Sequence, residues 1–418
     1  MFGRRRSLTF WIAVSIVAGI ALGYLFPQVA GELRVVSQIF LRLIRTIVAP
    51  LIFATLVVGI ASPSNLKQVG RMGVKALIYF EVVTTCALLI GWAAITLTQA
   101  GAGIQLPGGV DRAQLQAPAN RTWQTIVLDI FPENIAKSVA DNQVLQVVVF
   151  AVLFGCALAM LPDAKRRPLL AVIDSLAETM FSFTRIVMYL APFGVGAAIA
   201  YTVGNLGLGV LVNLAKLLAT FYVAVAVFVG IVLVPIALLV RVPLRRFVRA
   251  VTEPASIAFA TASSEAALPR AMEAMEHLGV PRQIVAFVMP TGYSFNLDGS
   301  TLYLSLAAIF VTQAAGIHLS VGQQFVLLLT LMLTSKGVAG VPRGALVILL
   351  ATVSSFGLPA EPVFIILGID QLMDMLRTSL NVVGNCLATV VIARWEGEYH
   401  EGIGDQESGV RAGSGVGE

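Results

Sequence analysis

Long apolar stretches recur along almost the whole chain of 418 residues, and they exclude most folds that are open to a water-soluble protein. A helix of about 20 apolar residues crosses a hydrocarbon core of about 30 Å. Only 12% of the residues are charged, against roughly 25% in a soluble domain. We therefore expect an all-α polytopic membrane protein. Its eight predicted transmembrane helices cover residues 8–26, 36–60, 72–98, 146–162, 170–201, 209–240, 280–315 and 361–394.

Lysine and arginine gather in every second predicted loop. Three arginines precede the first crossing, and further basic clusters follow the second, fourth and sixth. Short cytoplasmic loops collect such residues, so we expect both termini in the cytoplasm and a multi-pass protein of the plasma (cell inner) membrane. The net charge of +5 reflects this bias, and we expect the lipid bilayer, not nucleic acid, as the partner. Residues 398–418 are rich in Gly, Ser and Glu and predict a disordered tail.

Two further apolar segments are interrupted and predict re-entrant helical hairpins, at residues 245–279 and 317–358. The first contains "IAFATASSEAALPRAME" between two basic regions, and the second contains "LTSKGVAGVPRGALVILL". Irregular backbone at membrane depth is tolerated where it lines a cavity or is buried in protein. The hairpins start from opposite sides of the membrane, which predicts the inverted repeat of many secondary transporters. Ordinary helix kinks remain the alternative for each interruption.

Six polar residues follow one face of the last predicted crossing, within an arc of roughly 100° on an α-helix. Ionisable residues inside a membrane usually face a cavity or a partner. A purely structural Asp–Arg pair would explain two of the six and leave the others without a role. The six are Asp370, Asp374, Arg377, Thr378, Asn381 and Asn385.

The stretch "GYSFNLDGSTLY" predicts a break in the seventh crossing. Pro290, Gly292 and Gly299 bracket Asn296 and Asp298, so we expect an unwound segment with free carbonyl groups. Hard cations such as Na⁺ accept carbonyl, amide and carboxylate oxygens. This segment is therefore a predicted cation site.

The third crossing carries Glu81, Thr84 and Thr85 at spacings that place them on one helical face. A glutamate embedded in a membrane is a proton carrier, an ion ligand or a residue near the interface. All three roles stay open for Glu81.

The motifs "TASSEAALP", "NLDGST", "SKGVAGVP" and "DMLRTSLNVVGN" occur in an order that resembles the dicarboxylate/amino acid:cation symporters, the glutamate transporter family. The resemblance covers nearly the whole chain. It implies a homotrimer and an elevator mechanism, in which a transport domain slides against a scaffold domain. The implied scaffold comprises residues 1–69 and 101–208. The implied transport domain comprises residues 70–100, 209–244, 245–279, 280–316, 317–358 and 359–397.

The resemblance also implies substrate roles by position. Arg377, helped by Ser300, would bind a side-chain carboxylate, and Asp374 with Thr378 would bind an ammonium group. Backbone carbonyls near Ala262 and Val341 would also bind the ammonium group, while Asn381 and the Ser264 amide would hold the α-carboxylate. The implied substrate-binding set is Ala262, Ser263, Ser264, Ser300, Val341, Ala345, Asp374, Arg377, Thr378 and Asn381.

The coupling ions follow from the same resemblance, with departures. Asn385 and Glu81 stand where sodium-coupled relatives carry Asp and Tyr, so coupling to Na⁺, to H⁺ or to both stays open, and no organic cofactor is expected. Ala262 and Met375 stand where relatives carry an arginine, and Lys336 or Arg343 could compensate. The implied cation-binding set is Thr84, Thr85, Gly292, Ser294, Asn296, Asp298, Ser335, Val338, Asn381 and Asn385.

The presence of both Arg377 and Asp374 favours an acidic amino acid, L-glutamate or L-aspartate, with C4-dicarboxylates as the alternative substrate class. An intramembrane aspartyl protease built on Asp298 and Asp374 is disfavoured, because Arg377 lies one turn from Asp374 and no GxGD motif is present. No GxSxG motif surrounds "ASSEA" either. We therefore expect a carrier and not an enzyme. A pure channel is the weaker alternative, since two hairpin tips predict a closed site.

Overall fold

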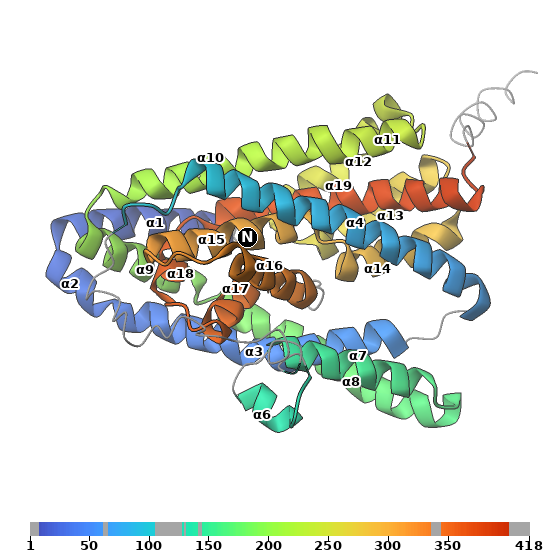
Figure 1. Cartoon of the computed structure of the whole chain (residues 1–418), viewed down its shortest axis with the longest axis horizontal. Helices are drawn as coiled ribbons and strands as arrows, with labels where there is room; N and C mark the ends of the chain where they lie inside the picture. Colours follow the sequence, from blue (N-terminus) through green and yellow to red (C-terminus); the bar gives the residue numbers. More distant parts are fainter. Residues whose placement is uncertain are drawn as a thin grey trace, which may run out of the picture.

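The computed structural model describes residues 8–61, 66–104, 128, 131–140, 144–335 and 344–400. These residues form helices and their connections, with no strand among them, so the predicted all-α fold is confirmed. Figure 1 shows that most long helices run along the longest axis of the molecule. The helices fall into two groups that each pack mainly within themselves.

The first group lies along the lower and left sides of Figure 1. Helix α1 packs along α9, and α3 packs against α7, α8 and α9. The α1–α9 contact is very close, because an added Cβ at Gly19 would lie 2.5 Å from the Gly196 carbonyl oxygen. Small residues commonly permit such close helix packing in membranes. The group comprises α1 (Leu8–Leu25), α2 (Pro27–Glu32), α3 (Arg34–Ala61), α6 (Ile135–Ala140), α7 (Val144–Ala159), α8 (Asp163–Met188) and α9 (Ala191–Leu206).

The second group surrounds α19, which contacts α4, α10, α12, α13, α14, α15 and α18. Helix α10 continues through the π-helical turn η1 into α11. The group comprises α4 (Leu66–Thr98), α10 (Val210–Phe228), η1 (Val229–Leu233), α11 (Val234–Leu239), α12 (Leu244–Thr261), α13 (Ser264–His277), α14 (Arg282–Phe295), α15 (Asp298–Ala314), α16 (Val321–Ser335), α17 (Gly344–Ser355), α18 (Glu361–Leu367) and α19 (Asp370–Glu396).

Three helical stretches in the described part of the chain are long and apolar enough to cross a membrane: Met72–Thr98, Val210–Leu239 and Asp370–Glu396. A fourth is added if α8 and α9, which meet at an angle of 50°, form one bent span. The helices at the remaining predicted crossings do not meet this criterion of length and apolar composition among the described residues, so the count of eight stays a prediction.

The break predicted in the seventh crossing is confirmed, because α14 ends at Phe295 and α15 begins at Asp298. Two other predicted crossings are also divided between two helices. The crossing at 170–201 is divided between α8 and α9, where Pro192 in the first turn of α9 favours a new helix start. The crossing at 361–394 is divided at Gly368, where an added Cβ would collide with the side chain of Ile199.

The first predicted hairpin is a helix–turn–helix unit. Helix α12 ends at Thr261, Ala262 has the left-handed φ of 49°, and Ser263 caps α13 by accepting a hydrogen bond from the Ala266 amide at 3.4 Å. Both helices pack against α19. The arms of the second hairpin are α16 and α17, while its tip, residues 336–343, lies outside the described residues. Membrane re-entry and the inverted repeat remain predictions.

The chain after α19 departs from the predicted tail at residues 398–400. Gly397 has a φ of 76°, and the Glu398 amide donates to the Ala393 carbonyl at 3.0 Å, which closes the helix end. The His400 amide then donates to the Gly279 carbonyl at 3.1 Å. Arg394 lies 4.1 Å above the Tyr399 ring. These residues are therefore packed against the protein, and residues 401–418 lie outside the described part.

Candidate functional site

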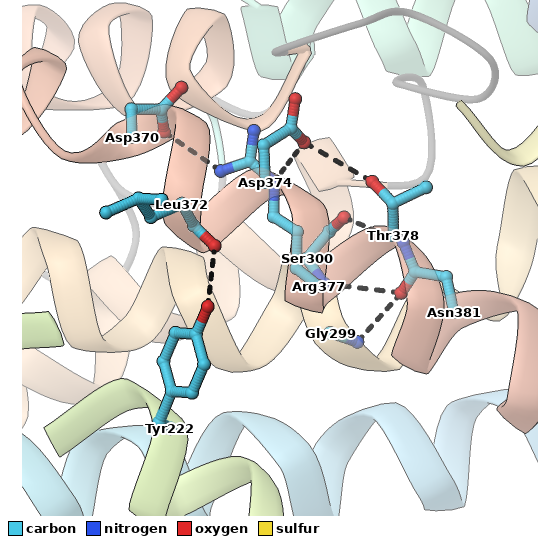
Figure 2. A network of polar contacts seen from close by, with 9 residues as sticks. All are labelled: Tyr222, Gly299, Ser300, Asp370, Leu372, Asp374, Arg377, Thr378 and Asn381. Carbon is cyan, nitrogen blue, oxygen red and sulfur yellow. Dashed lines mark hydrogen bonds and ion pairs between the residues drawn. The ribbon is translucent and has the colours of Figure 1, made fainter. Parts of the chain in front are cut away.

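Arg377 on α19 is held between two aspartates in the interior of the second helix group (Figure 2). Its Nη1 lies 3.0 Å from Asp370 Oδ1, and its Nε lies 2.8 Å from Asp374 Oδ1. The three side chains are 2%, 0% and 6% exposed. Buried charges in proteins are usually paired. The predicted polar face of α19 is thus an organised charge cluster.

Tyr303 on α15 completes this cluster and was not predicted from the sequence. The Arg377 guanidinium carbon lies 4.3 Å from the centroid of the Tyr303 ring. The edge of that ring meets Phe221 of α10 at 6.2 Å and 90°. The available signal was spacing, since Tyr303 follows Gly299 of the predicted site by one helical turn.

The second terminal nitrogen of Arg377, Nη2, is buried and has no hydrogen-bond partner among the described residues. Buried donors are normally satisfied. A carboxylate ligand could satisfy this one, and guanidinium–carboxylate contacts are strong because both groups are charged.

Thr378 and Asn381 extend the polar face along α19. The Thr378 hydroxyl donates to Asp374 Oδ1 at 3.3 Å. Asn381 Oδ1 accepts hydrogen bonds from the Gly299 and Ser300 amides at 2.8 and 3.3 Å, and its Nδ2 donates to Ser300 Oγ at 3.1 Å. The first amides of a helix lack partners within it. Asn381 therefore caps α15 and fastens it to α19.

The hairpin residues of the predicted substrate set lie in three places. Ala262, Ser263 and Ser264 form the tip between α12 and α13, and Ala345 is buried in the first turn of α17. Val341 lies outside the described residues, as do Lys336 and Arg343. The Ser379 hydroxyl donates to the Ala255 carbonyl at 3.0 Å and joins α19 to the first hairpin.

The predicted cation residues of α14, α15 and α19 are brought together at the helix break. Asn296 and Asp298 are fully buried, and Asn296 Nδ2 donates to Asp298 Oδ2 at 3.4 Å. Asn385 is 1% exposed, and neither its Oδ1 nor its Nδ2 has a hydrogen-bond partner in the part of the chain that the structure describes. Gly292 of α14 faces Asn385 across the interface. The described residues contain no cluster of three or more His, Cys, Asp or Glu side chains. The amides of Asn296 and Asn385 and the carboxylate of Asp298 are oxygen donors that suit a hard cation.

The predicted residues of α4 and α16 approach one another. The buried Thr84 hydroxyl donates to the Phe80 carbonyl at 2.7 Å, and the Thr85 hydroxyl donates to Met332 Sδ of α16 at 3.5 Å. Glu81 is half-buried on the same helix. Ser335 is buried, with its hydroxyl on the Met332 carbonyl at 2.8 Å.

Of two further residues in the predicted cation-binding set, the structure describes only one. Ser294 lies in the last turn of α14, and Val338 falls outside the described residues. The structure therefore brings most, but not all, of the predicted set to the surroundings of α19.

Comparison with known proteins shows the family to which this sequence belongs. The profile of the "Sodium:dicarboxylate symporter family" matches residues 8–395. The "Proton/glutamate-aspartate symporter" of Escherichia coli (strain K12) is 44% identical over 94% of this chain and 94% of its own length. The "Proton/sodium-glutamate symport protein" of Bacillus caldotenax is 41% identical over 96% and 98%.

Relatives with a different printed substrate are nearly as similar. The "C4-dicarboxylate transport protein" of Serratia proteamaculans (strain 568) is 42% identical over 93% of this chain and 92% of its own length. The family profile and these relatives each cover nearly the whole sequence. The chain therefore belongs to the sodium:dicarboxylate symporter family.

Proposed function

We propose that this protein is a secondary active symporter that takes up L-glutamate or L-aspartate together with Na⁺, H⁺ or both. The observation that carries this proposal is the pairing of Arg377 with Asp374 on one buried face, 2.8 Å apart. A guanidinium with a buried, unsatisfied Nη2 suits a carboxylate, and an adjacent carboxylate suits an ammonium group. An acidic amino acid carries both groups.

Substrate groups have specific places in this proposal. Arg377 binds the side-chain carboxylate with Ser300 nearby, while Asp374 and Thr378 bind the ammonium group. The α-carboxylate is held by Asn381 and the Ser264 amide, and Ala262, Ser263, Val341 and Ala345 line the site.

A C4-dicarboxylate is the second candidate substrate, and one relative carries that printed function. It has no ammonium group to neutralise Asp374, which is 6% exposed. Bringing a second carboxylate toward a buried aspartate is unfavourable because like charges repel strongly in a poorly solvated site. The geometry therefore favours the amino acids.

Cation coupling is assigned to the helix break and its neighbours. Two cation sites are proposed. Asn296, Asp298, Thr84 and Thr85 form the deeper site, and Asn385, beside Gly292, contributes to the second. Backbone carbonyls of Ser294, Ser335 and Val338 add ligands. Glu81 is the proposed proton carrier, because a half-buried carboxyl on α4 lies one turn from Thr84 and Thr85.

We further propose an elevator mechanism in a homotrimer of the cell inner membrane, with cytoplasmic termini. The first helix group is the scaffold and the second is the transport domain, with eight crossings and two inverted hairpins. The packing of the described helices supports this division, since contacts between the groups are restricted to a few pairs such as α3 with α17 and α9 with α18.

A competition experiment tests the substrate assignment. Uptake of labelled aspartate into proteoliposomes is measured with an excess of unlabelled glutamate, aspartate, succinate or serine. We expect glutamate and aspartate to compete strongly and succinate weakly. Strong competition by succinate with none by glutamate would instead support the C4-dicarboxylate function.

A further inference from the structure

Two glycines lie on opposite sides of the interface between α19 and the broken pair α14–α15. Gly384 of α19 faces Asp298, and an added Cβ would collide with Asp298 Oδ2. Gly292 of α14 faces Asn385, and an added Cβ would collide with Asn385 Oδ1. Because Gly384 and Asn385 are consecutive on α19, the two contacts are reciprocal. Helix α19 supplies one glycine and one polar side chain, while α14 supplies the other glycine and α15 the other polar side chain.

These contacts differ in kind from most of the other close glycine contacts. Gly19 and Gly101 face backbone carbonyl oxygens, and Gly194 faces the side chain of Phe40. Such contacts set the distance between helices. Gly292 and Gly384 instead face the polar ends of short, buried side chains, where Asp298 is 0% and Asn385 is 1% exposed. A methyl group here would displace an oxygen ligand before it displaced a helix.

The buried amide of Asn385 provides an independent observation. Neither of its polar atoms has a hydrogen-bond partner among the described residues, and Asn296 Oδ1 nearby on the helix break has none either. Unsatisfied buried polar groups are rare and require an explanation. A bound cation would accept these oxygens, since hard cations take amide and carbonyl ligands.

We propose that Gly384 and Gly292 are positioning residues for Na⁺. They leave room for the Asp298 carboxylate and the Asn385 amide at the α19 interface, and so determine the sodium affinity without touching the amino acid substrate. This inference rests on the proposed cation coupling and names the ion for it. The substrate cluster at Arg377 lies two turns away along α19 and keeps its own contacts.

The test compares glycine variants by two readouts, the melting temperature of the purified protein and the uptake of labelled aspartate. Both are titrated with NaCl, with choline chloride as the replacement salt. In Gly384→Ala and Gly292→Ala, we expect the sodium concentration at half-maximal effect to rise by roughly tenfold, which corresponds to about 1.4 kcal/mol of binding free energy. The apparent KM for aspartate at saturating sodium stays within about twofold of the parent value.

Two control glycines separate positioning from general packing. Gly230 in η1 has no atom within 4 Å of an added Cβ, so Gly230→Ala leaves both readouts unchanged. Gly91 of α4 faces Ser305 Oγ and the Leu302 carbonyl of α15. Gly91→Ala therefore lowers the melting temperature without changing the sodium midpoint.

A double variant tests the inference where the single variant folds poorly. If Gly292→Ala does not fold, the double variant Gly292→Ala/Asn385→Ala removes the collision and restores folding, but not the sodium response. A parental sodium midpoint in the folded variants overturns the inference, and so does a parent protein whose stability and uptake ignore Na⁺. A different result would contradict the proposed symport itself, namely uptake that neither a sodium nor a proton gradient drives.

Discussion

The guanidinium of Arg377 lies 4.3 Å from the centre of the Tyr303 ring, with both residues buried between α15 and α19. This contact fixes the plane of the guanidinium from one side, while Asp370 and Asp374 hold two of its nitrogens. Aromatic rings attract cations more strongly where water is excluded. The ring of Tyr303 therefore orients the group that we assign to substrate binding.

Replacing this ring is expected to weaken the binding of acidic amino acids. A desolvated cation–π contact is worth about 2 kcal/mol, so Tyr303→Leu should raise the inhibition constant for aspartate by about 30-fold. Tyr303→Phe keeps the ring and should change it by less than about threefold. Equal losses in both variants, measured by competition against labelled aspartate, would show that the hydroxyl group, not the ring, is required.

Removing the guanidinium should change the substrate class. In Arg377→Cys we expect uptake of glutamate and aspartate to be lost, because no cation remains for the side-chain carboxylate. Uptake of serine should persist, since Asp374, Thr378 and Asn381 still bind the groups that all amino acids share. Loss of neutral and acidic substrates alike, in a protein with a parental elution profile, would remove the assigned role.

Removing one of the two aspartates should make the stability of the protein respond more strongly to added substrate. Breaking a buried ion pair costs about 3–5 kcal/mol where no partner remains, and Asp374 still pairs with Arg377 in Asp370→Asn, so the loss should be smaller. The carboxylate of a bound substrate would replace the missing charge. Aspartate should then raise the melting temperature more than in the parent protein.

An exposed ion pair provides the control for this variant. Glu253, which is 68% exposed beside Arg270, should tolerate Glu253→Gln, because surface pairs contribute little. An aspartate-induced shift in Asp370→Asn no larger than the parental shift would contradict the assignment of Arg377 to the substrate.

Glu81 is expected to control the response of transport to pH. In Glu81→Gln the proposed proton carrier is lost, so uptake at a fixed sodium gradient should no longer vary with external pH. Initial rates from about pH 5.5 to about pH 8.5, on both sides of neutrality, provide the measurement. Glu273→Gln on the exposed surface of α13 is the matched control. A parental pH profile in Glu81→Gln would exclude Glu81 as the carrier.

Local sequence patterns predicted the polar face of α19 and the break between Phe295 and Asp298. Both depend on short-range features, namely helical period and a cluster of Gly, Pro and Asn residues. The tip of the first hairpin was predictable for the same reason. Family resemblance added the roles of individual side chains, which spacing alone could not provide.

Contacts between distant segments could not be predicted. At the break before α19, Ile199 of α9 occupies the space where a side chain at position 368 would lie. Tyr303 joined the charge cluster only because α15 packs against α19. Likewise, the capping of α15 by Asn381 requires two helices that are far apart in sequence. Apart from the helical spacing of Tyr303 and Gly299, the sequence contains no signal for such pairings.

In the proposed symport, a cation gradient drives an acidic amino acid across the membrane against its own concentration gradient. The most direct measurement is the accumulation of labelled aspartate in proteoliposomes under an inward gradient of sodium, of protons, or of neither. We predict an internal aspartate concentration above the external one with at least one gradient, which collapses when an ionophore dissipates it. Equilibration to equal concentrations under every gradient would contradict symport and leave a passive pathway instead.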